Sequence, residues 1–84
     1  MARFVYLSWV RERIGTREEE IELPDSVETV ADVIEFLREH DEPHRAVMEH
    51  EKVIRFALDQ EVAEPHDRIA GASEIAIFPP MTGG

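Results

Sequence analysis

The sequence contains no cysteine, so it has no disulfide framework, no cysteine-based zinc site and no thiol nucleophile. Basic residues are also scarce, because 19 acidic side chains face 9 basic ones and the formal net charge is -10. This balance argues against binding nucleic acid or an anionic membrane surface, and it fits a basic protein partner or solubility alone. Because the chain has no thiol, any sulfur chemistry must use sulfur supplied from outside it.

Long apolar runs are missing as well. The first residues lack the apolar stretch of a secretion signal, and no segment approaches the length of a membrane span. We therefore expect a cytoplasmic protein. A phosphate-binding glycine loop and a Ser/His/Asp signature are also absent, and a chain of 84 residues is too small for a large internal cleft. We do not expect the isolated chain to be an enzyme.

Glycine is rare too, yet two of the four glycines are Gly83 and Gly84 at the very end. Such an ending arises by chance in only about 0.5% of chains, although a frayed terminus is the plain alternative. Glycine has no Cβ and can enter a narrow slot, while Pro79 and Pro80 favour an extended exit. Residues 79–84 can span roughly 20 Å. The terminal carboxylate is therefore the predicted reactive group.

The hydrophobic pattern predicts an α+β domain. Alternating residues predict strands, and apolar residues at helical spacing from Val30 to Leu37, after a capping pair of Thr29 and Asp32, predict one amphipathic helix. Pro43 opens a second, shorter helix. The expected elements are a strand over 3–9, a helical turn over 10–14 ended by Gly15, a strand over 17–23, the main helix, a helix over 44–50, a strand over 53–58, a short extended piece around Val62 and a strand over 74–78.

Apolar residues occur on both faces of the predicted sheet. In the last strand Ile75 and Ile77 face one side and Phe78 the other, and in the first strand Leu7 and Trp9 lie opposite the expected core face. Together with Val62 these groups either complete the core or form an exposed patch of the kind that marks an interface. For Trp9 both readings are equally open. The tail leaves from the same edge, directly after Phe78.

Two polar groupings are candidate sites. His40 and His44 have the i, i+4 spacing of a helical metal pair, but Pro43 between them argues against a continuous helix. We therefore predict solvated surface histidines and no metal site. The acidic run at residues 18–20 is expected to be a solvated strand face.

The sequence resembles the small, sulfur-carrying subunit of molybdopterin synthase, a family of ubiquitin-like β-grasp proteins. The similarity lies in Phe4-Val5-Tyr6-Leu7 followed by Val10-Arg11-Glu12 and Gly15, in Asp59-Gln60, and most specifically in the terminal run Phe78-Pro79-Pro80-Met81-Thr82-Gly83-Gly84. The resemblance implies a β-grasp domain over 1–78, with a mixed sheet of four or five strands and one main helix on one face. An extended tail over 79–84 would follow.

The same resemblance implies a mechanism. An adenylating enzyme of the ubiquitin-activating type would use ATP on Gly84, and a sulfur donor protein would then convert the carboxylate to a thiocarboxylate. The tail, comprising Pro79, Pro80, Met81, Thr82, Gly83 and Gly84, would enter the large catalytic subunit and give sulfur to a cyclic pyranopterin precursor of the molybdenum cofactor. Leu7, Val62 and Phe78 would form the interface with that subunit, in a heterotetramer. No cofactor would be bound to the chain itself.

Other functions remain open at this point. The same thiocarboxylate chemistry serves thiamine synthesis, tRNA thiolation or protein modification, and a Gly-Gly end alone does not separate these pathways. A β-grasp adaptor with an inert tail is a second alternative. A small acidic inhibitor or DNA mimic is a third, motivated only by the charge.

Overall fold

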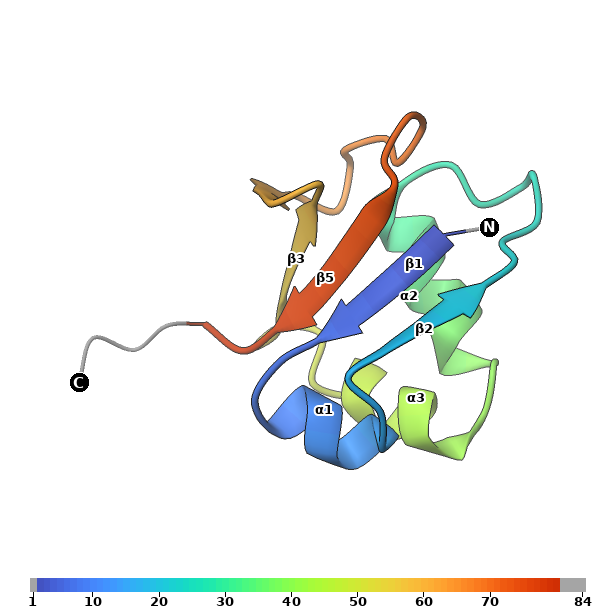
Figure 1. Ribbon diagram of the computed structural model, residues 1–84. Helices are drawn as coiled ribbons and strands as arrows, with labels where there is room; N and C mark the ends of the chain where they lie inside the picture. Colours follow the sequence, from blue (N-terminus) through green and yellow to red (C-terminus); the bar gives the residue numbers. More distant parts are fainter. Residues whose placement is uncertain (1, 81–84) are drawn as a thin grey trace.

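The computed structural model describes residues 2–80 of the chain. The elements follow the predicted order and type (Figure 1). They are β1 (Ala2–Tyr6), α1 (Trp9–Ile14), β2 (Glu18–Ile21), α2 (Val30–Arg38), α3 (Glu42–Met48), β3 (Arg55–Leu58), β4 (Glu61–Ala63) and β5 (Glu74–Phe78).

The five strands form one mixed sheet in the order β2-β1-β5-β3-β4. The central pair, β1 and β5, is parallel, and the other neighbours are antiparallel. In Figure 1 the helices lie behind the sheet and at its lower end, so they cover only one of its two faces. The predicted α+β class, with a mixed sheet and one main helix on one face, is confirmed.

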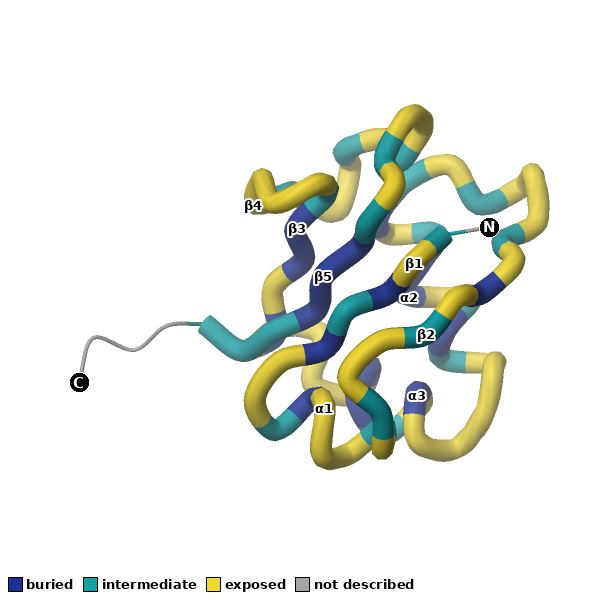
Figure 2. Tube along the Cα trace, in the orientation of Figure 1, coloured by how far each residue is buried: buried dark blue, intermediate teal, exposed yellow. Residues whose placement is uncertain are grey.

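The core lies between the sheet and the helices. Phe4 and Tyr6 of β1 and Ile77 of β5 are completely buried there, together with Val33 and Leu37 of α2. Figure 2 shows buried (dark blue) and more exposed residues in alternation along β1, whereas β5 is buried over Ile75, Ala76 and Ile77. Within β5, Ile75 and Ile77 belong to the core cluster and Ala76 does not, which matches the predicted facing because side chains of a strand point to opposite faces in turn.

Local interactions begin α2 where the sequence predicts. The Thr29 hydroxyl accepts a hydrogen bond from the backbone N–H of Asp32, and the Asp32 carboxylate accepts from the backbone of Thr29 and of Glu28. The two backbone hydrogen bonds hold the pKa of Asp32 below its usual value. This capping box satisfies N–H groups that an unprotected helix start leaves without partners.

A tight turn joins β3 to β4 and fixes the start of β5. Asp59 and Gln60 both have positive φ, at 48° and 74°, as in the two-residue hairpin turns that match strand twist. The Asp59 carboxylate accepts from the backbone N–H groups of Ser73 and Glu74 at 3.0 and 2.9 Å. The turn therefore anchors the strand from which the tail departs.

The predicted strand over 3–9 is too long. β1 ends at Tyr6 because the chain turns sharply at Ser8, where φ is 58° and ψ is -138°, and α1 begins at Trp9. Leu7 still continues the pairing of β1 with β5, since its N–H donates to the carbonyl of Ile77 at 3.2 Å. Trp9 consequently belongs to the helix layer and not to the open face.

Candidate docking face and tail exit

The face that the helices leave open carries an apolar hollow of about 730 Å³. The sheet register places one row of its lining across four strands: Val5 lies beside Ala76, Ala76 beside Ala57, and Ala57 beside Val62. The two alanines lie on the adjacent strands β5 and β3 and have the smallest side chains of the row. Larger groups surround them, so the face is concave.

Larger apolar side chains border this hollow. Leu7 is 41% and Val62 is 66% exposed, while Phe78 is half-buried. The structure thus brings together the three residues predicted for an interface, all of which line the same hollow. Exposed apolar groups clustered on a strongly charged chain are typical of a protein–protein contact. The partner itself stays a prediction.

The tail begins at the rim of the hollow. Phe78 is the last residue of β5, and Pro79 and Pro80 follow directly and line the same surface. Both prolines fix φ near -65°, which favours an extended course. The remaining predicted tail residues, Met81, Thr82, Gly83 and Gly84, lie outside the described residues.

Charged residues lie at the end of the open face that is away from the tail. Arg3 donates to Glu74 at 2.9 Å and lies 3.6 Å from Glu18, and all three side chains are partly exposed. Exposed ion pairs of this kind contribute little to stability. Their main effect is to give the apolar hollow a polar boundary, as in the rim of an interface.

Trp9 lies away from this hollow. Its indole packs partly buried against the core and meets the ring of His50 edge-on, with centroids 5.4 Å apart. Of the two readings left open by the sequence, the core role holds for Trp9. The docking candidate therefore comprises Leu7, Val62 and Phe78 without it.

The prediction of solvated histidines is wrong for His44, which is 3% exposed. Its Nε2 lies 2.7 Å from the Glu19 carboxylate, and its Nδ1 lies 2.5 Å from that of Asp41. The Tyr6 hydroxyl donates to the same Glu19 oxygen at 2.7 Å. Glu19 is therefore not part of a simple solvated strand face, because it is half-buried and turned toward the helix layer.

This polar cluster affects two ionisable groups. Burial first, and then the hydrogen bond to the Glu19 carboxylate, raise the pKa of Tyr6 well above its usual value, so the phenol stays a donor. Burial tends to raise the pKa of Asp41, but the backbone N–H and ring of His44 outweigh it and hold that pKa below its usual value. The cluster joins β1, β2 and α3 through polar contacts that are buried or partly buried.

None of the helices between residues 2 and 80 combines the length and apolarity needed to cross a bilayer.

The strand order, the helix across one sheet face and the tail after the last strand define a ubiquitin-like β-grasp domain. The chain belongs to the ThiS family, whose sequence model matches residues 4–84.

Its relatives include molybdopterin synthase sulfur carrier subunits from two nematodes and an alga. Those of Caenorhabditis elegans and Caenorhabditis briggsae are 38% and 42% identical in alignments 73 residues long, which cover 84% of this chain and 82% of each relative. That of Chlamydomonas reinhardtii is 33% identical over 84 residues, covering 98% of this chain and 96% of the relative. These similarities confirm the family indicated by the sequence motifs.

Two solved structures share the fold. SAMP1 from Haloferax volcanii is 24% identical with a TM-score of 0.72, and the match covers 99% of this chain and 98% of that one. The putative molybdopterin converting factor, subunit 1, from Pyrococcus furiosus is 23% identical with a TM-score of 0.76, covering 95% and 97%.

Proposed function

We propose that this chain is a sulfur carrier subunit of molybdopterin synthase. The proposal rests on sequence identity of 33–42% to three proteins of that name. Each alignment covers most of this chain and most of the relative. The family match extends to Gly84, and the tail leaves the domain beside an apolar hollow. Both features suit a carrier that docks with its domain and reacts with its end.

The proposed reactive group is the carboxylate of Gly84. A carboxylate is a poor acyl donor, so an adenylating enzyme must first join it to AMP with release of pyrophosphate from ATP. Hydrosulfide delivered by a donor protein then displaces AMP, which gives a thiocarboxylate. Its sulfur anion attacks a side-chain carbon of the pyranopterin precursor within the large catalytic subunit and displaces an oxygen substituent from that carbon. Hydrolysis of the resulting acyl–sulfur bond leaves the sulfur on the pterin and restores the carboxylate.

The domain and the tail have separate tasks in this proposal. Residues 1–78 supply a rigid docking body, in which β5 fixes the point of departure, and residues 79–84 supply the reach. Six extended residues span roughly 20 Å, enough to enter a partner's active site. Thr82 and Gly83 would occupy the narrow part of that channel, since Gly83 adds no side-chain bulk there.

Docking would bury the hollow formed around Leu7, Val62 and Phe78. Removal of its exposed apolar surface from water would supply the driving force, and the surrounding charges would select the partner and its orientation. The large subunit would contact this face in a heterotetramer.

A reconstituted synthase tests the proposed reaction. The assay combines the chain with large subunit, adenylating enzyme, ATP, sulfur donor and pyranopterin precursor, and it measures molybdopterin formed. We expect deletion of Gly84 to abolish formation while the folded domain still binds the large subunit. Undiminished formation by the truncated chain would refute the proposal.

A matched pair of substitutions tests the docking face separately. Val62 is 66% exposed in the hollow, and Val53 is 48% exposed outside its lining. We expect Val62→Asp to weaken binding to the large subunit at least tenfold and Val53→Asp to leave it nearly unchanged. Equal effects of the two substitutions in a calorimetric titration would remove the hollow from the interface.

A further inference from the structure

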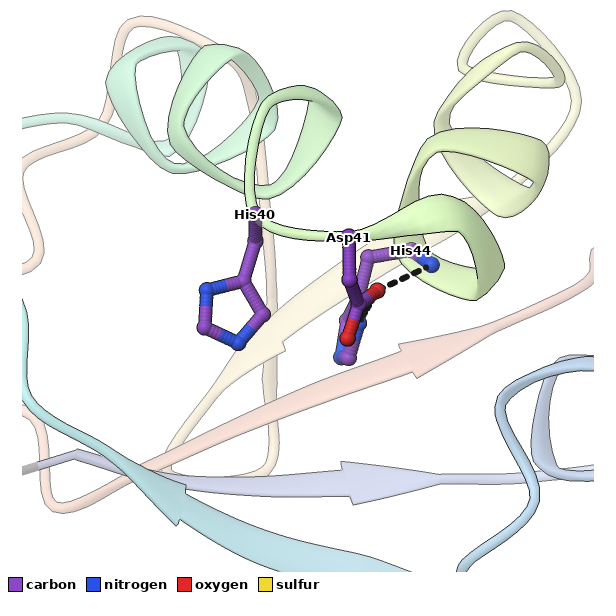
Figure 3. Close-up of side chains that lie close together, drawn as sticks. All are labelled: His40, Asp41 and His44. Atoms are coloured by element: carbon purple, nitrogen blue, oxygen red, sulfur yellow. Dashed lines mark hydrogen bonds and ion pairs between the residues drawn. The ribbon is translucent and has the colours of Figure 1, made fainter.

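A short turn between α2 and α3 brings three potential metal ligands together. α2 ends at Arg38, α3 begins at Glu42, and His40, Asp41 and His44 come from the turn and from the first part of α3. Figure 3 shows their side chains close to one another beneath this turn. One ligand atom from each residue lies within 4.8 Å of the others, and the two imidazole centroids are 5.0 Å apart.

The break in the helix does not separate the histidines. Pro43 prevents a continuous helix through both, as the sequence predicts, but the turn restores their proximity. A cluster of this kind is usually a helix cap beside a buried histidine. Asp41 does cap α3, because its carboxylate accepts a hydrogen bond from the backbone N–H of His44 at 3.0 Å. Both hydrogen bonds from His44 go to Oδ1 of Asp41, so the cap does not require Oδ2.

His44 already makes the second contact that is common for a metal-binding histidine. Its side chain is 4% exposed, and Nε2 lies 2.7 Å from Glu19 Oε2. Metal-binding histidines commonly donate one ring N–H to a carboxylate, which fixes the ring and directs the other nitrogen to the ion. Here the other nitrogen, Nδ1, faces Asp41 and the exposed side of the cluster, where His40 lies.

We propose that His40, Asp41 and His44 bind a divalent transition-metal ion, for which zinc is the best fit. Two imidazoles and one carboxylate are a typical ligand set for zinc, and three protein ligands leave a fourth position for water. His44 would use Nδ1 and keep Nε2–H on Glu19. The ion would take the place of the contact between Nδ1 and Asp41 Oδ1.

The location indicates what the ion would do. Through His44 and Glu19 it would link the α2–α3 turn to the edge strand β2, on the helix side of the sheet. The docking hollow lies on the opposite face, so metal binding and partner binding do not compete for a surface. The role expected for the ion is therefore to stabilise the domain.

The test uses untagged, chelator-treated full-length protein titrated with Zn²⁺ against a chromophoric competitor. We expect one ion per chain and a rise in the melting temperature on binding. His40→Ala should weaken binding at least about tenfold, in line with the losses that even outer-shell changes cause. Asp41→Asn should do the same while preserving α3, because asparagine is an equally good helix cap.

His66→Ala is the matched control, since His66 is exposed and lies near one carboxylate, that of Asp67, but outside the cluster. It should bind Zn²⁺ as the unmodified chain does. Histidine ring resonances observed by NMR should shift for His40 and His44 and stay in place for His66. Equal affinity in His40→Ala and the unmodified chain, or an equal loss in His66→Ala, would overturn the site. Neither result depends on sulfur transfer.

Discussion

Two leucines of identical chemistry should respond very differently to truncation. Leu37 of α2 is completely buried in the core, whereas Leu7 is 41% exposed at the docking hollow. Leu37→Ala removes buried groups worth about 0.8 kcal/mol per methylene and leaves a cavity, so we expect a loss of about 2 to 5 kcal/mol. Leu7→Ala changes a surface that is already partly hydrated, and its cost should stay below about 1 kcal/mol.

Urea denaturation followed by circular dichroism, with thermal melts alongside, measures both variants. For a domain of this size each kcal/mol corresponds to about 4 to 8 °C in melting temperature, so Leu37→Ala should melt at least about 8 °C below the unmodified chain. Leu7→Ala should instead weaken binding to the large subunit. A loss of stability in Leu7→Ala equal to that in Leu37→Ala would show that Leu7 belongs to the core and refute the open face.

Three further substitutions probe local features. Tyr6→Phe removes the hydroxyl that donates to the Glu19 carboxylate and should cost about 1.5 to 3 kcal/mol in urea unfolding, while an unchanged midpoint would deny the buried cluster any role. The pKa of Asp32 is lower in the folded state than in the unfolded state. Its contribution to folding stability is therefore present above the unfolded pKa of about 3.9 and is lost as pH falls through the folded pKa. The melting temperature measured between about pH 6 and about pH 2.5 should depend less on pH in Asp32→Asn. Ser8→Gly relieves a positive φ that costs of order 1 to 3 kcal/mol, so it should raise the melting temperature, and a lower one would contradict that strain.

The types and order of the elements were predictable because each carries its own local signal. Val30, Val33 and Leu37 recur at helical spacing, and Ile75 and Ile77 alternate with residues of the opposite face. The end of β1 was not predictable in this way. Alternation continues through Trp9, and the turn at Ser8 uses a backbone conformation for which the sequence offers no glycine.

The polar cluster was missed for a different reason. His44 is buried by partners from β1 and β2, which are distant in sequence, and its spacing from His40 says nothing about them. One signal was nevertheless available: Glu19 stands two residues before Ile21, which faces the core, so strand periodicity places both on the helix side. The acidic run hid this, because its three members are chemically identical.

The candidate docking face was largely predictable. Leu7, Val62 and Phe78 were apolar residues on strand faces opposite the core, and the structure gathers them around one hollow. Its concave centre was not foreseen, since it depends on the register that sets Ala57 beside Ala76. The terminal motif was the most specific feature of the sequence, and its proposed role depends on the reactivity of the Gly84 carboxylate and not on a contact within the domain.

The most direct measurement is therefore the intact mass of the chain after incubation with ATP, its adenylating enzyme and a sulfur source. The proposed carrier role predicts a gain equal to the exchange of one oxygen for sulfur, and fragmentation should locate it at Gly84. An unchanged mass, with an adenylating enzyme that is active on another carrier, would contradict that role and favour an adaptor.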